Sequence, residues 1–204
     1  MLFEDTYRTI TSNHEGSYKE KGSKFIAFAI PSKNEDDVKQ QLEKIRKQYY
    51  DARHHCYAYR LGADKSAQRM NDDGEPSGTA GRPIFGQILS NDLTNILIVV
   101  IRYFGGTKLG VSGLINAYKT ATKDALEDAK IITKTINDMY EVDFKYERMN
   151  NVMKIIKDEG LNMLDSRFEM DCSIKFAVRK KYSQMIYEKF EKINNLKIKY
   201  LYTN

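Results

Sequence analysis

The stretch "NILIVVIRYFGGTKLGVSG", residues 95–113, decides how the rest of the chain is read. Its first nine residues hold a continuous apolar run, residues 96–101, that is rich in β-branched side chains. Strands buried on both faces have such continuous runs, whereas a strand with one solvated face alternates. We therefore predict a central β-strand over residues 95–103. A glycine-rich loop follows it and leads into a helix that begins near Ser112 or Gly113 and ends near Ala129.

Upstream of this stretch, the apolar pattern predicts strands and one helix. Weak alternation over residues 7–11 and a clearer apolar stretch over residues 24–30 predict a β-meander. Ser32-Lys33-Asn34-Glu35 has capping-box spacing, and the apolar residues that follow it at helical intervals predict a helix over residues 34–50. Residues 55–61 then have the composition of another strand.

Between that strand and the central one, the chain is rich in glycine and carboxylates as far as Gly81, and we predict a loop there. Pro83 suits the first turn of a helix, because proline lacks the N–H that a helix start leaves unused. The spacing of Ile84, Ile88 and Leu89 predicts a short helix with these residues on one side.

Apolar periodicity restarts after Lys130 with a second set of elements. The patterns follow the order strand, helix, strand, strand, helix, strand, over residues 140–144, 149–156, 161–168, 174–178, 185–190 and 196–200. This βαββαβ order is that of the split-βαβ, ferredoxin-like unit. We predict an α+β protein with one domain at residues 1–135 and a second at residues 136–204.

Composition and charge place the chain among globular proteins and exclude some classes. The 33 basic and 28 acidic residues give a net charge of +5, which mildly favours acidic partners. Cys56 and Cys172 lack CxxC spacing, so we expect neither a zinc site nor a disulfide framework, and a reducing cytoplasm. No signal peptide is visible, and the longest apolar run, residues 96–101, is too short for a membrane span. We expect no membrane association.

The glycine-rich loop after the central strand allows two interpretations. Gly105, Gly106 and Gly110 precede a predicted helix start, with Arg102 and Lys108 beside them. Small residues let a backbone approach a ligand, and free N–H groups at a helix start attract anions such as phosphate. The spacing matches no nucleotide-binding motif. The same glycines can also serve only to form a tight turn, and both interpretations stay open.

The earlier loop, "NDDGEPSGTAGR" over residues 71–82, carries three carboxylates: Asp72, Asp73 and Glu75. Carboxylates at this density suit a hard cation or general acid–base chemistry, but Asp-Gly and Glu-Pro pairs are also ordinary turn chemistry. We favour the turn and expect no bound metal or cofactor. His54 and His55 are adjacent on a predicted strand and point to opposite faces, so we expect one outward and one buried histidine.

A second basic surface is predicted in the last 70 residues. Lys175 and Arg179 alternate with apolar residues on one strand, and Lys197 and Lys199 do so on another. If these two strands are neighbours, one open face of the sheet is basic and suits phosphate backbones. A solvated strand face without any ligand is the alternative.

Three motifs resemble one known family. "DARHHCYAYRLG" (residues 51–62), "NDDGEPSGTAGRPI" (residues 71–84) and "VVIRYFGGTKLGVSGLINAY" (residues 99–118) resemble the IMPACT/YigZ family. The resemblance covers essentially the whole chain. It implies an N-terminal domain like the second domain of ribosomal protein S5, and a C-terminal ferredoxin-like domain similar to domain V of elongation factor G. Eukaryotic members are associated with translational control, through binding an activator of a stress-responsive kinase on the ribosome.

The resemblance also implies a functional surface in which the two loops close over one groove, with His54 and Arg60 on the edge of a sheet that carries Arg102. The residues implied as ligand- or anion-binding are Arg60, Ser77, Thr79, Arg82, Arg102, Tyr103, Gly105, Gly106 and Lys108. If the protein is an enzyme, the catalytic candidates are Asp72, Asp73, Glu75 and His54.

Three functional hypotheses follow. The first is a non-catalytic cytoplasmic regulator associated with translation, which binds RNA or the ribosome through the loop groove. The second is an enzyme acting on a phosphorylated or nucleotide-like small molecule, with the carboxylates as metal ligands or base. The third is a module that binds a protein partner of the translation machinery. A closed pocket with inward carboxylates favours the enzyme, whereas carboxylates bonded to their own backbone favour a binding module.

Overall fold

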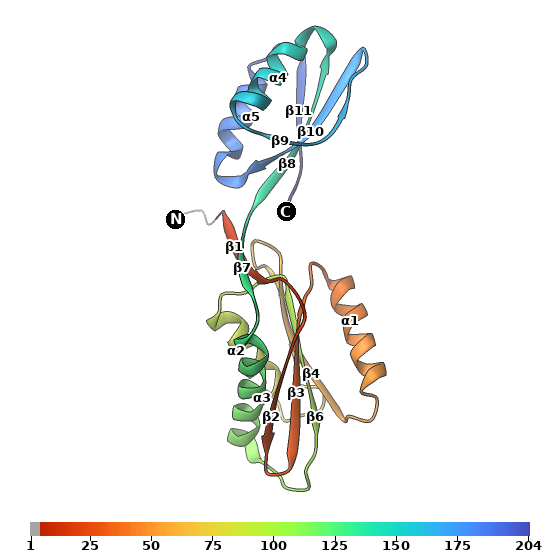
Figure 1. Cartoon of the computed structure of the whole chain (residues 1–204), viewed down its shortest axis with the longest axis vertical. Helices are drawn as coiled ribbons and strands as arrows, with labels where there is room; N and C mark the ends of the chain where they lie inside the picture. Colours follow the sequence, from red (N-terminus) through yellow and green to blue (C-terminus); the bar gives the residue numbers. More distant parts are fainter. Residues whose placement is uncertain (1–4) are drawn as a thin grey trace. The chain divides into compact units, whose positions relative to one another are not determined.

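A computed structural model describes residues 5–204, so the first four residues of the predicted first domain lie outside it. The described chain divides into two compact units (Figure 1). One is Tyr7–Lys134, and the other is Thr135–Asn204 together with the first described residues. Each unit has its own buried core. Residues 5–204 contain five α-helices and several β-sheets, which make a mixed α and β structure.

The first unit is built on a five-stranded antiparallel sheet of order β2-β3-β6-β4-β5. Its strands are β2 His14–Glu20, β3 Ser23–Pro31, β6 Ile96–Tyr103, β4 His54–Leu61 and β5 Ala67–Asn71. The prediction of a central strand is confirmed, because β6 lies in the middle of the sheet. All its residues up to Arg102 are buried. Its β-branched run fits a position covered on both faces.

Helices cover both faces of this sheet (Figure 1). Helix α1, Glu35–Gln48, lies on one face, and α2, Gly81–Ser90, and α3, Gly110–Glu127, lie on the other. The side chains of β6 alternate between two cores. Ile98 and Val100 join the core beneath α2 and α3, whereas Leu97, Val99 and Ile101 join the core beneath α1.

Several local predictions need correction. The predicted loop before Gly81 contains β5, which the polar sequence "AQRMN" does not reveal. Strand β1, Thr6–Ile10, pairs with β7, Ile131–Thr135, so the meander includes only β2 and β3. The N-cap of α1 is Asn34, whose side chain accepts from the N–H of Asp37, and not the Ser32 that begins the capping-box pattern. On α2, Leu89 is exposed, and Phe85 joins the core instead.

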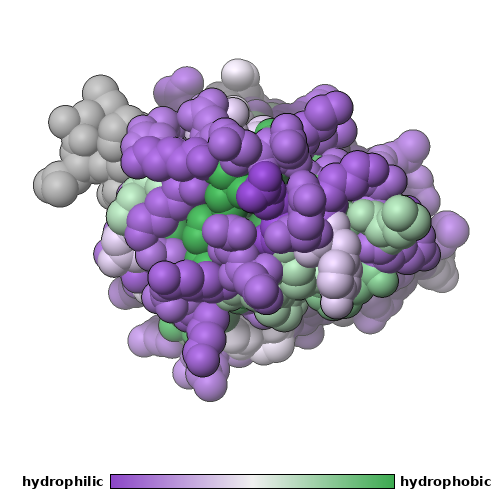
Figure 2. Space-filling view, turned by 90° about the horizontal axis from the view of Figure 1, so that it is seen from above, coloured by the Kyte–Doolittle hydropathy of each residue, from purple (hydrophilic) through white to green (hydrophobic). Residues whose placement is uncertain are grey.

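The second unit has the predicted order of strands and helices. Its elements are β8 Asn137–Lys145, α4 Met149–Asp158, β9 Asn162–Arg167, β10 Asp171–Arg179, α5 Ser183–Glu191 and β11 Leu196–Thr203, with short 3-10 turns at Tyr146–Arg148 and Lys180–Tyr182. The sheet has the order β11-β8-β10-β9, and both helices pack on one face of it. Figure 2 looks onto this unit, whose surface is mostly hydrophilic with hydrophobic residues between.

Close packing of β2 against α3 generates a testable prediction. A Cβ added at Gly16 would lie 2.2 Å from the backbone nitrogen of Ala125, whereas a Cβ at Gly86 in α2 meets nothing within 4 Å. We expect Gly16→Ala to lower the free energy of unfolding by about 1–3 kcal/mol, as overpacking does.

Gly86→Ala is the matched control. It should raise the free energy of unfolding by roughly 0.5–1 kcal/mol, because alanine favours a helix interior more than glycine does. Urea denaturation of both variants measures the difference. Equal stability of the two would contradict the packing described for β2 and α3.

Candidate functional site

A cavity of about 500 Å³ lies in the first unit, where β6 ends and β4 begins. The antiparallel register places His54 of β4 opposite Arg102 of β6, so the two strand ends meet there. The lining residues are Arg53, His54, Glu75, Pro76, Arg102, Phe104, Lys108, Leu109, Gly110, Val111 and Leu114. This volume falls within the range of small-molecule and cofactor pockets.

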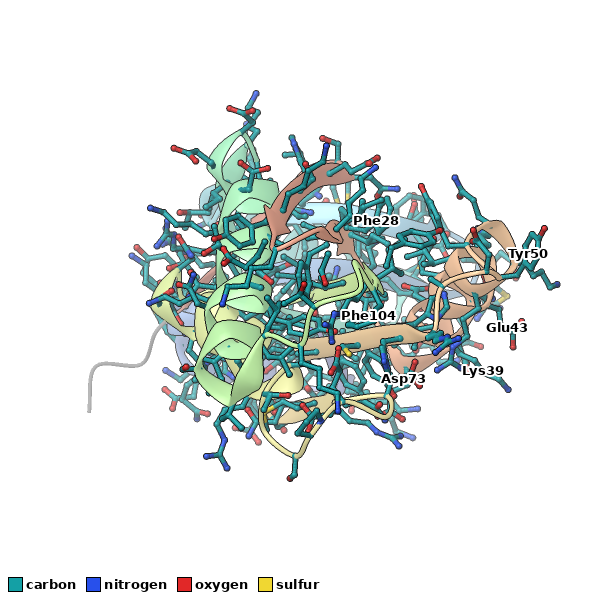
Figure 3. The ribbon with its side chains drawn as sticks, turned by 90° about the horizontal axis from the view of Figure 1, so that it is seen from below. Phe28, Lys39, Glu43, Tyr50, Asp73 and Phe104 are labelled. Atoms are coloured by element: carbon teal, nitrogen blue, oxygen red, sulfur yellow. The ribbon has the colours of Figure 1, made fainter. Side chains whose placement is uncertain are left out.

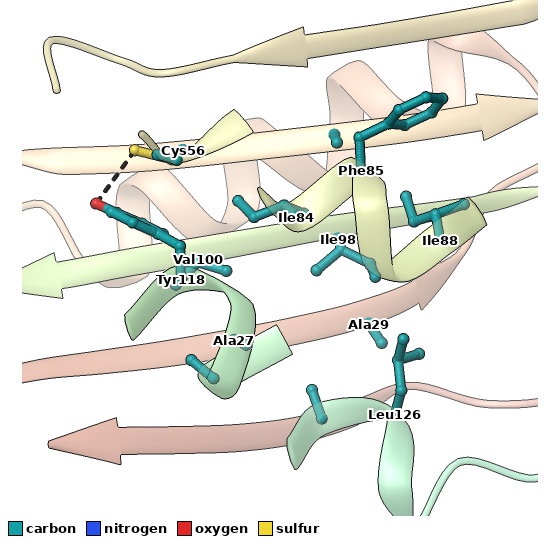
Figure 4. Packing of buried hydrophobic residues seen from close by; sticks show 14 of the residues in the cluster. Ala27, Ala29, Cys56, Ile84, Phe85, Ile88, Ile98, Val100, Tyr118 and Leu126 are labelled. Atoms are coloured by element: carbon teal, nitrogen blue, oxygen red, sulfur yellow. Dashed lines mark hydrogen bonds between the residues drawn. The ribbon is translucent and has the colours of Figure 1, made fainter. Parts of the chain in front are cut away.

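A buried ion pair forms one wall of the cavity. Arg102 Nη1 donates to Glu75 Oε1 at 2.7 Å, and the two side chains are only 7% and 4% exposed. Tyr118 of α3 donates to the same oxygen at 2.8 Å, and Cys56 Sγ of β4 donates to the Tyr118 hydroxyl at 3.3 Å (Figure 4). Glu75 thus joins the acidic loop, which is residues 72–80 between β5 and α2, to β6 and α3, and through Tyr118 to β4.

The thiol and the phenol of this network are neutral groups. Burial raises the pKa of the Cys56 thiol and the pKa of Tyr118 far above their usual values. The thiolate is the nucleophilic form of cysteine, so Cys56 is not an activated nucleophile. Its role is to bond the hydroxyl of Tyr118 and the backbone carbonyl of Asp72, which lies 3.0 Å from Sγ.

Asp72 fixes the acidic loop to the start of α2. Its carboxylate accepts from the backbone N–H groups of Gly78 at 2.8 Å, Ala80 at 3.0 Å and Gly81 at 2.8 Å. Since α2 begins at Gly81, the carboxylate acts as a cap from outside the helix. Burial opposes its ionisation, but the three N–H bonds outweigh that effect and lower the pKa of Asp72.

Asp73 and the histidines are also bonded to the backbone. Asp73 Oδ2 accepts from the N–H of His55 at 2.6 Å, and its Oδ1 lies 3.6 Å from Arg46 Nη2. His54 Nδ1 bonds the carbonyl of Asp73 at 2.9 Å, and His55 Nε2 bonds the carbonyl of Tyr49 at 3.0 Å. His55 is buried, as predicted, whereas His54 is half-buried and bonds the loop carbonyl of Asp73 instead of pointing outward.

The rim of the cavity is apolar and basic. Phe104 is 53% exposed and Val111 is 60% exposed, and the charged rim residues Arg53 and Lys108 are exposed as well. The guanidinium carbon of Arg102 lies 5.6 Å from the centre of the Phe104 ring. Figure 3 shows Phe104 near the middle of this end of the unit.

The glycines of the loop after β6 divide into two kinds. A Cβ at Gly105 would lie 1.8 Å from the backbone of Gly22, so this glycine permits close contact with the β2–β3 turn. Gly106 and Gly110 have φ of +87° and +69°, and a Cβ at either would meet open space. Their backbone conformation requires glycine. Helix α3 begins at Gly110 with no side-chain cap at Leu109, and its first residues, Gly110 and Val111, line the cavity.

The structure brings together only some of the residues implied for the groove. His54, Glu75, Arg102 and Lys108 line the cavity. Arg60 does not, because it lies at the other end of β4 and bonds Asp92 and the carbonyl of Leu93, each at 3.3 Å. Strand β4 is also flanked on both sides by β6 and β5, so it is not a sheet edge.

The remaining implied residues lie outside the cavity lining. Thr79 is buried and bonds the carbonyl of Pro76, Tyr103 bonds Asp51, and Ser77 and Arg82 are exposed. The sequence did not single out Arg53, Phe104, Leu109, Val111 and Leu114 as site residues. No signal in the sequence marked them, because single apolar residues are common on protein surfaces.

The predicted basic face of the second unit is not formed. Strands β10 and β11 are not neighbours, because β8 lies between them and presents Glu141 and Asp143 on the same face. Lys175 Nζ lies 3.7 Å from Glu141 and 3.8 Å from Asp165, and Lys199 and Lys197 are opposite Glu141 and Asp143 in register. Arg179 pairs with Asp5. The face therefore has alternating charges.

Residues 5–204 contain neither a metal-binding cluster nor a helix suited to cross a membrane. No cluster of three or more histidine, cysteine, aspartate or glutamate side chains in that range is arranged to hold a metal ion. Within the same range, no helix has both the length and the apolar character needed to cross a membrane.

Comparison with known proteins identifies the family. The sequence model of the Impact N-terminal domain matches residues 21–126, which is just over half of the chain. The chain belongs to the IMPACT family. IMPACT family member YvyE of Bacillus subtilis is 28% identical over 93% of this chain and 88% of its own length. IMPACT family member YigZ of Escherichia coli is 31% identical over 78% of each chain. The crystal structure of a hypothetical protein aligns with a TM-score of 0.73 at 25% identity, covering 98% of this chain and 99% of its own.

The Asp72 cap predicts a stability that depends on pH. We expect Asp72→Asn to lower the free energy of unfolding by about 1–2 kcal/mol at pH 7. Because the folded-state pKa lies below the usual 3.8, the difference should be complete above that value and disappear as pH falls through the folded-state pKa. Urea unfolding between pH 7 and pH 3 measures it. The exposed Asp36→Asn should change little, and a pH-independent loss for Asp72→Asn would contradict the cap.

The buried ion pair predicts a larger loss. Glu75→Gln leaves the Arg102 charge buried without a carboxylate, so we expect a loss of roughly 3 kcal/mol or more in unfolding free energy. The double variant Glu75→Gln/Arg102→Met should recover part of it, because both charges are then removed. The exposed Glu43→Gln on α1 is the control (Figure 3). A fully additive double variant would show that the two side chains do not interact.

Proposed function

We propose that this protein is a translation-associated regulator that binds RNA, free or on the ribosome, through the cavity of its first unit and without catalysing a reaction. The observation that carries the proposal is the composition of the cavity rim. An exposed aromatic ring, two exposed cations and an uncapped helix N-terminus surround one hollow. Cationic grooves with aromatic side chains are typical of proteins that bind single-stranded nucleic acid.

The charges of the site suit phosphate. Lys108 and Arg53 are exposed and belong to no ion pair among residues 5–204, so both are available to a ligand. The first N–H groups of α3 carry the positive end of the helix dipole, which adds to the attraction for an anion. Glu75 does not cancel this attraction, because Arg102 neutralises it within the wall.

The contacts of the carboxylates favour a binding module over an enzyme. Asp72 is bonded to three backbone N–H groups and Asp73 to the N–H of His55, and neither lines the cavity. A general base must reach the proton that it abstracts. Only Glu75 and His54 among the catalytic candidates border the cavity, and Glu75 Oε1 is already bonded to Arg102 and Tyr118.

Family membership supports the translation part of the proposal, since the resemblance described above associates eukaryotic members with translational control.

We also propose that the first unit has the fold of the second domain of ribosomal protein S5. For the second unit we propose a ferredoxin-like fold similar to domain V of elongation factor G, with the domain boundary near residue 135 and a cytoplasmic location. A protein of the translation machinery is a further candidate partner, and a protein-binding site need not show the salt dependence of an RNA site.

RNA binding should depend on salt and on the rim cations. We expect the protein to bind single-stranded RNA with an affinity that falls with salt, and Lys108→Ala and Arg53→Ala each to weaken binding. If each side chain contacts one phosphate, each variant should reduce the slope of log affinity against log salt by about 0.7. Fluorescence anisotropy over a salt series measures both quantities.

Lys39→Ala is the matched control, because it removes the same charge from α1, away from Phe104 (Figure 3). It should leave the affinity and the slope nearly unchanged. Equal losses in all three variants would assign the binding to net charge alone. Absence of any salt-dependent RNA binding would overturn the proposed function.

A further inference from the structure

We propose that the cavity holds one unpaired nucleotide, whose base packs against Phe104 and carries an exocyclic amino group. This inference rests on the proposed function and makes it more specific. It names the chemical group that enters the cavity, which the rim charges alone do not define.

The ring of Phe104 is placed to stack. More than half of the residue is exposed, although it lies next to the guanidinium of Arg102, which contacts a second ring, Phe25, at 5.5 Å. Arg102 is held by Glu75, so the ring rests beside a fixed group. Exposed aromatic rings of this kind bind bases through stacking that does not depend on base identity. Leu109, Val111 and Leu114 add apolar surface around the same hollow.

The wall next to the ring offers hydrogen-bond acceptors. His54 Nδ1 faces the carbonyl oxygen of Asp73 at 2.9 Å, and because a carbonyl can only accept, Nδ1 carries the hydrogen. In the neutral ring Nε2 is therefore an acceptor, and it lies 4.0 Å from Glu75 Oε1. Both bonds to Glu75 use Oε1, and no hydrogen bond to its Oε2 is made within residues 5–204. Acceptors match a base that brings an N–H₂ donor.

The residues suited to a phosphate and the hydrogen-bond acceptors come from different elements around the same cavity. Lys108, Gly110 and Val111 belong to the loop after β6 and the start of α3, whereas His54 and Glu75 belong to β4 and the acidic loop. A ligand that fills the space needs a phosphate, a flat apolar middle and N–H donors. A nucleotide with an amino-bearing base has all three. A paired base does not, because its amino group is already bonded and its faces are stacked.

The test compares probes that differ only in the base. Oligocytidylate and oligouridylate of about eight nucleotides have equal charge, and cytosine has an amino group where uracil has a carbonyl. We expect oligocytidylate to bind at least about fivefold tighter, and an abasic ribose-phosphate chain to bind more weakly than either. Phe104→Ala should weaken oligocytidylate binding by roughly 5-fold to 100-fold and leave the abasic chain unaffected.

Tyr50→Ala is the matched control, because Tyr50 is 84% exposed and lies on the α1 side away from Phe104 (Figure 3). It should bind all probes as the native protein does. Thermal melting should show Phe104→Ala folded, as expected for a half-exposed side chain, and Phe104→Leu repeats the test with a smaller change in volume.

The outcomes separate this inference from the proposed function. Salt-dependent RNA binding with equal affinity for the three probes, unaffected by Phe104→Ala, would overturn the nucleotide site and leave the RNA-binding function standing. Equal affinity for the two bases would overturn the amino-group requirement. Free cytidine monophosphate distinguishes the source of the ligand: if it binds through Phe104 while RNA does not, the site takes free nucleotides and the proposed function fails. Binding of neither overturns both.

Discussion

The first unit is organised around one buried ion pair, between Glu75 and Arg102. Two charges that are 4% and 7% exposed are costly to bury alone, so each requires the other to be held in place. Glu75 comes from a loop without regular structure and Arg102 from the central strand. Tyr118 of α3 bonds the same carboxylate oxygen, so one oxygen atom fixes a loop, a strand and a helix to each other. The cavity lies beside this ion pair, where side chains of the loop, the strand and the helix leave a space.

The rest of the acidic loop supports that arrangement. Asp72 satisfies three backbone N–H groups at the start of α2, and Asp73 bonds β4 at His55. Backbone groups near a helix start are costly to bury unbonded, and a carboxylate satisfies several at once. Each carboxylate of this loop thus has a partner in the fold, and together they hold the loop against the sheet.

Much of the fold followed from the sequence because burial imposes periodicity. The run before Tyr103 could only be a strand covered on both faces, and the alternating patterns after Lys130 gave the element order of the second unit. Strand β5 and the pairing of β1 with β7 were missed, because their stabilisation comes from neighbouring strands and not from their own composition. The placement of Arg60 was wrong for a related reason. The sequence places Arg60 near the end of its strand, but only the antiparallel register shows that it lies opposite Ile96, at the start of β6, and not beside Arg102.

The site divides into residues that hold its shape and exposed residues that line the cavity, and this division explains why the sequence identified only some of them. Charged and glycine residues in the two loops attract notice because they are rare in packed structure. Many of them, including Asp72, Asp73 and Gly105, serve the scaffold. The surface left for a ligand is carried by Phe104, Val111 and the exposed cations, which look ordinary in a sequence. A large apolar side chain becomes informative only when the structure shows that it stays exposed beside a cavity.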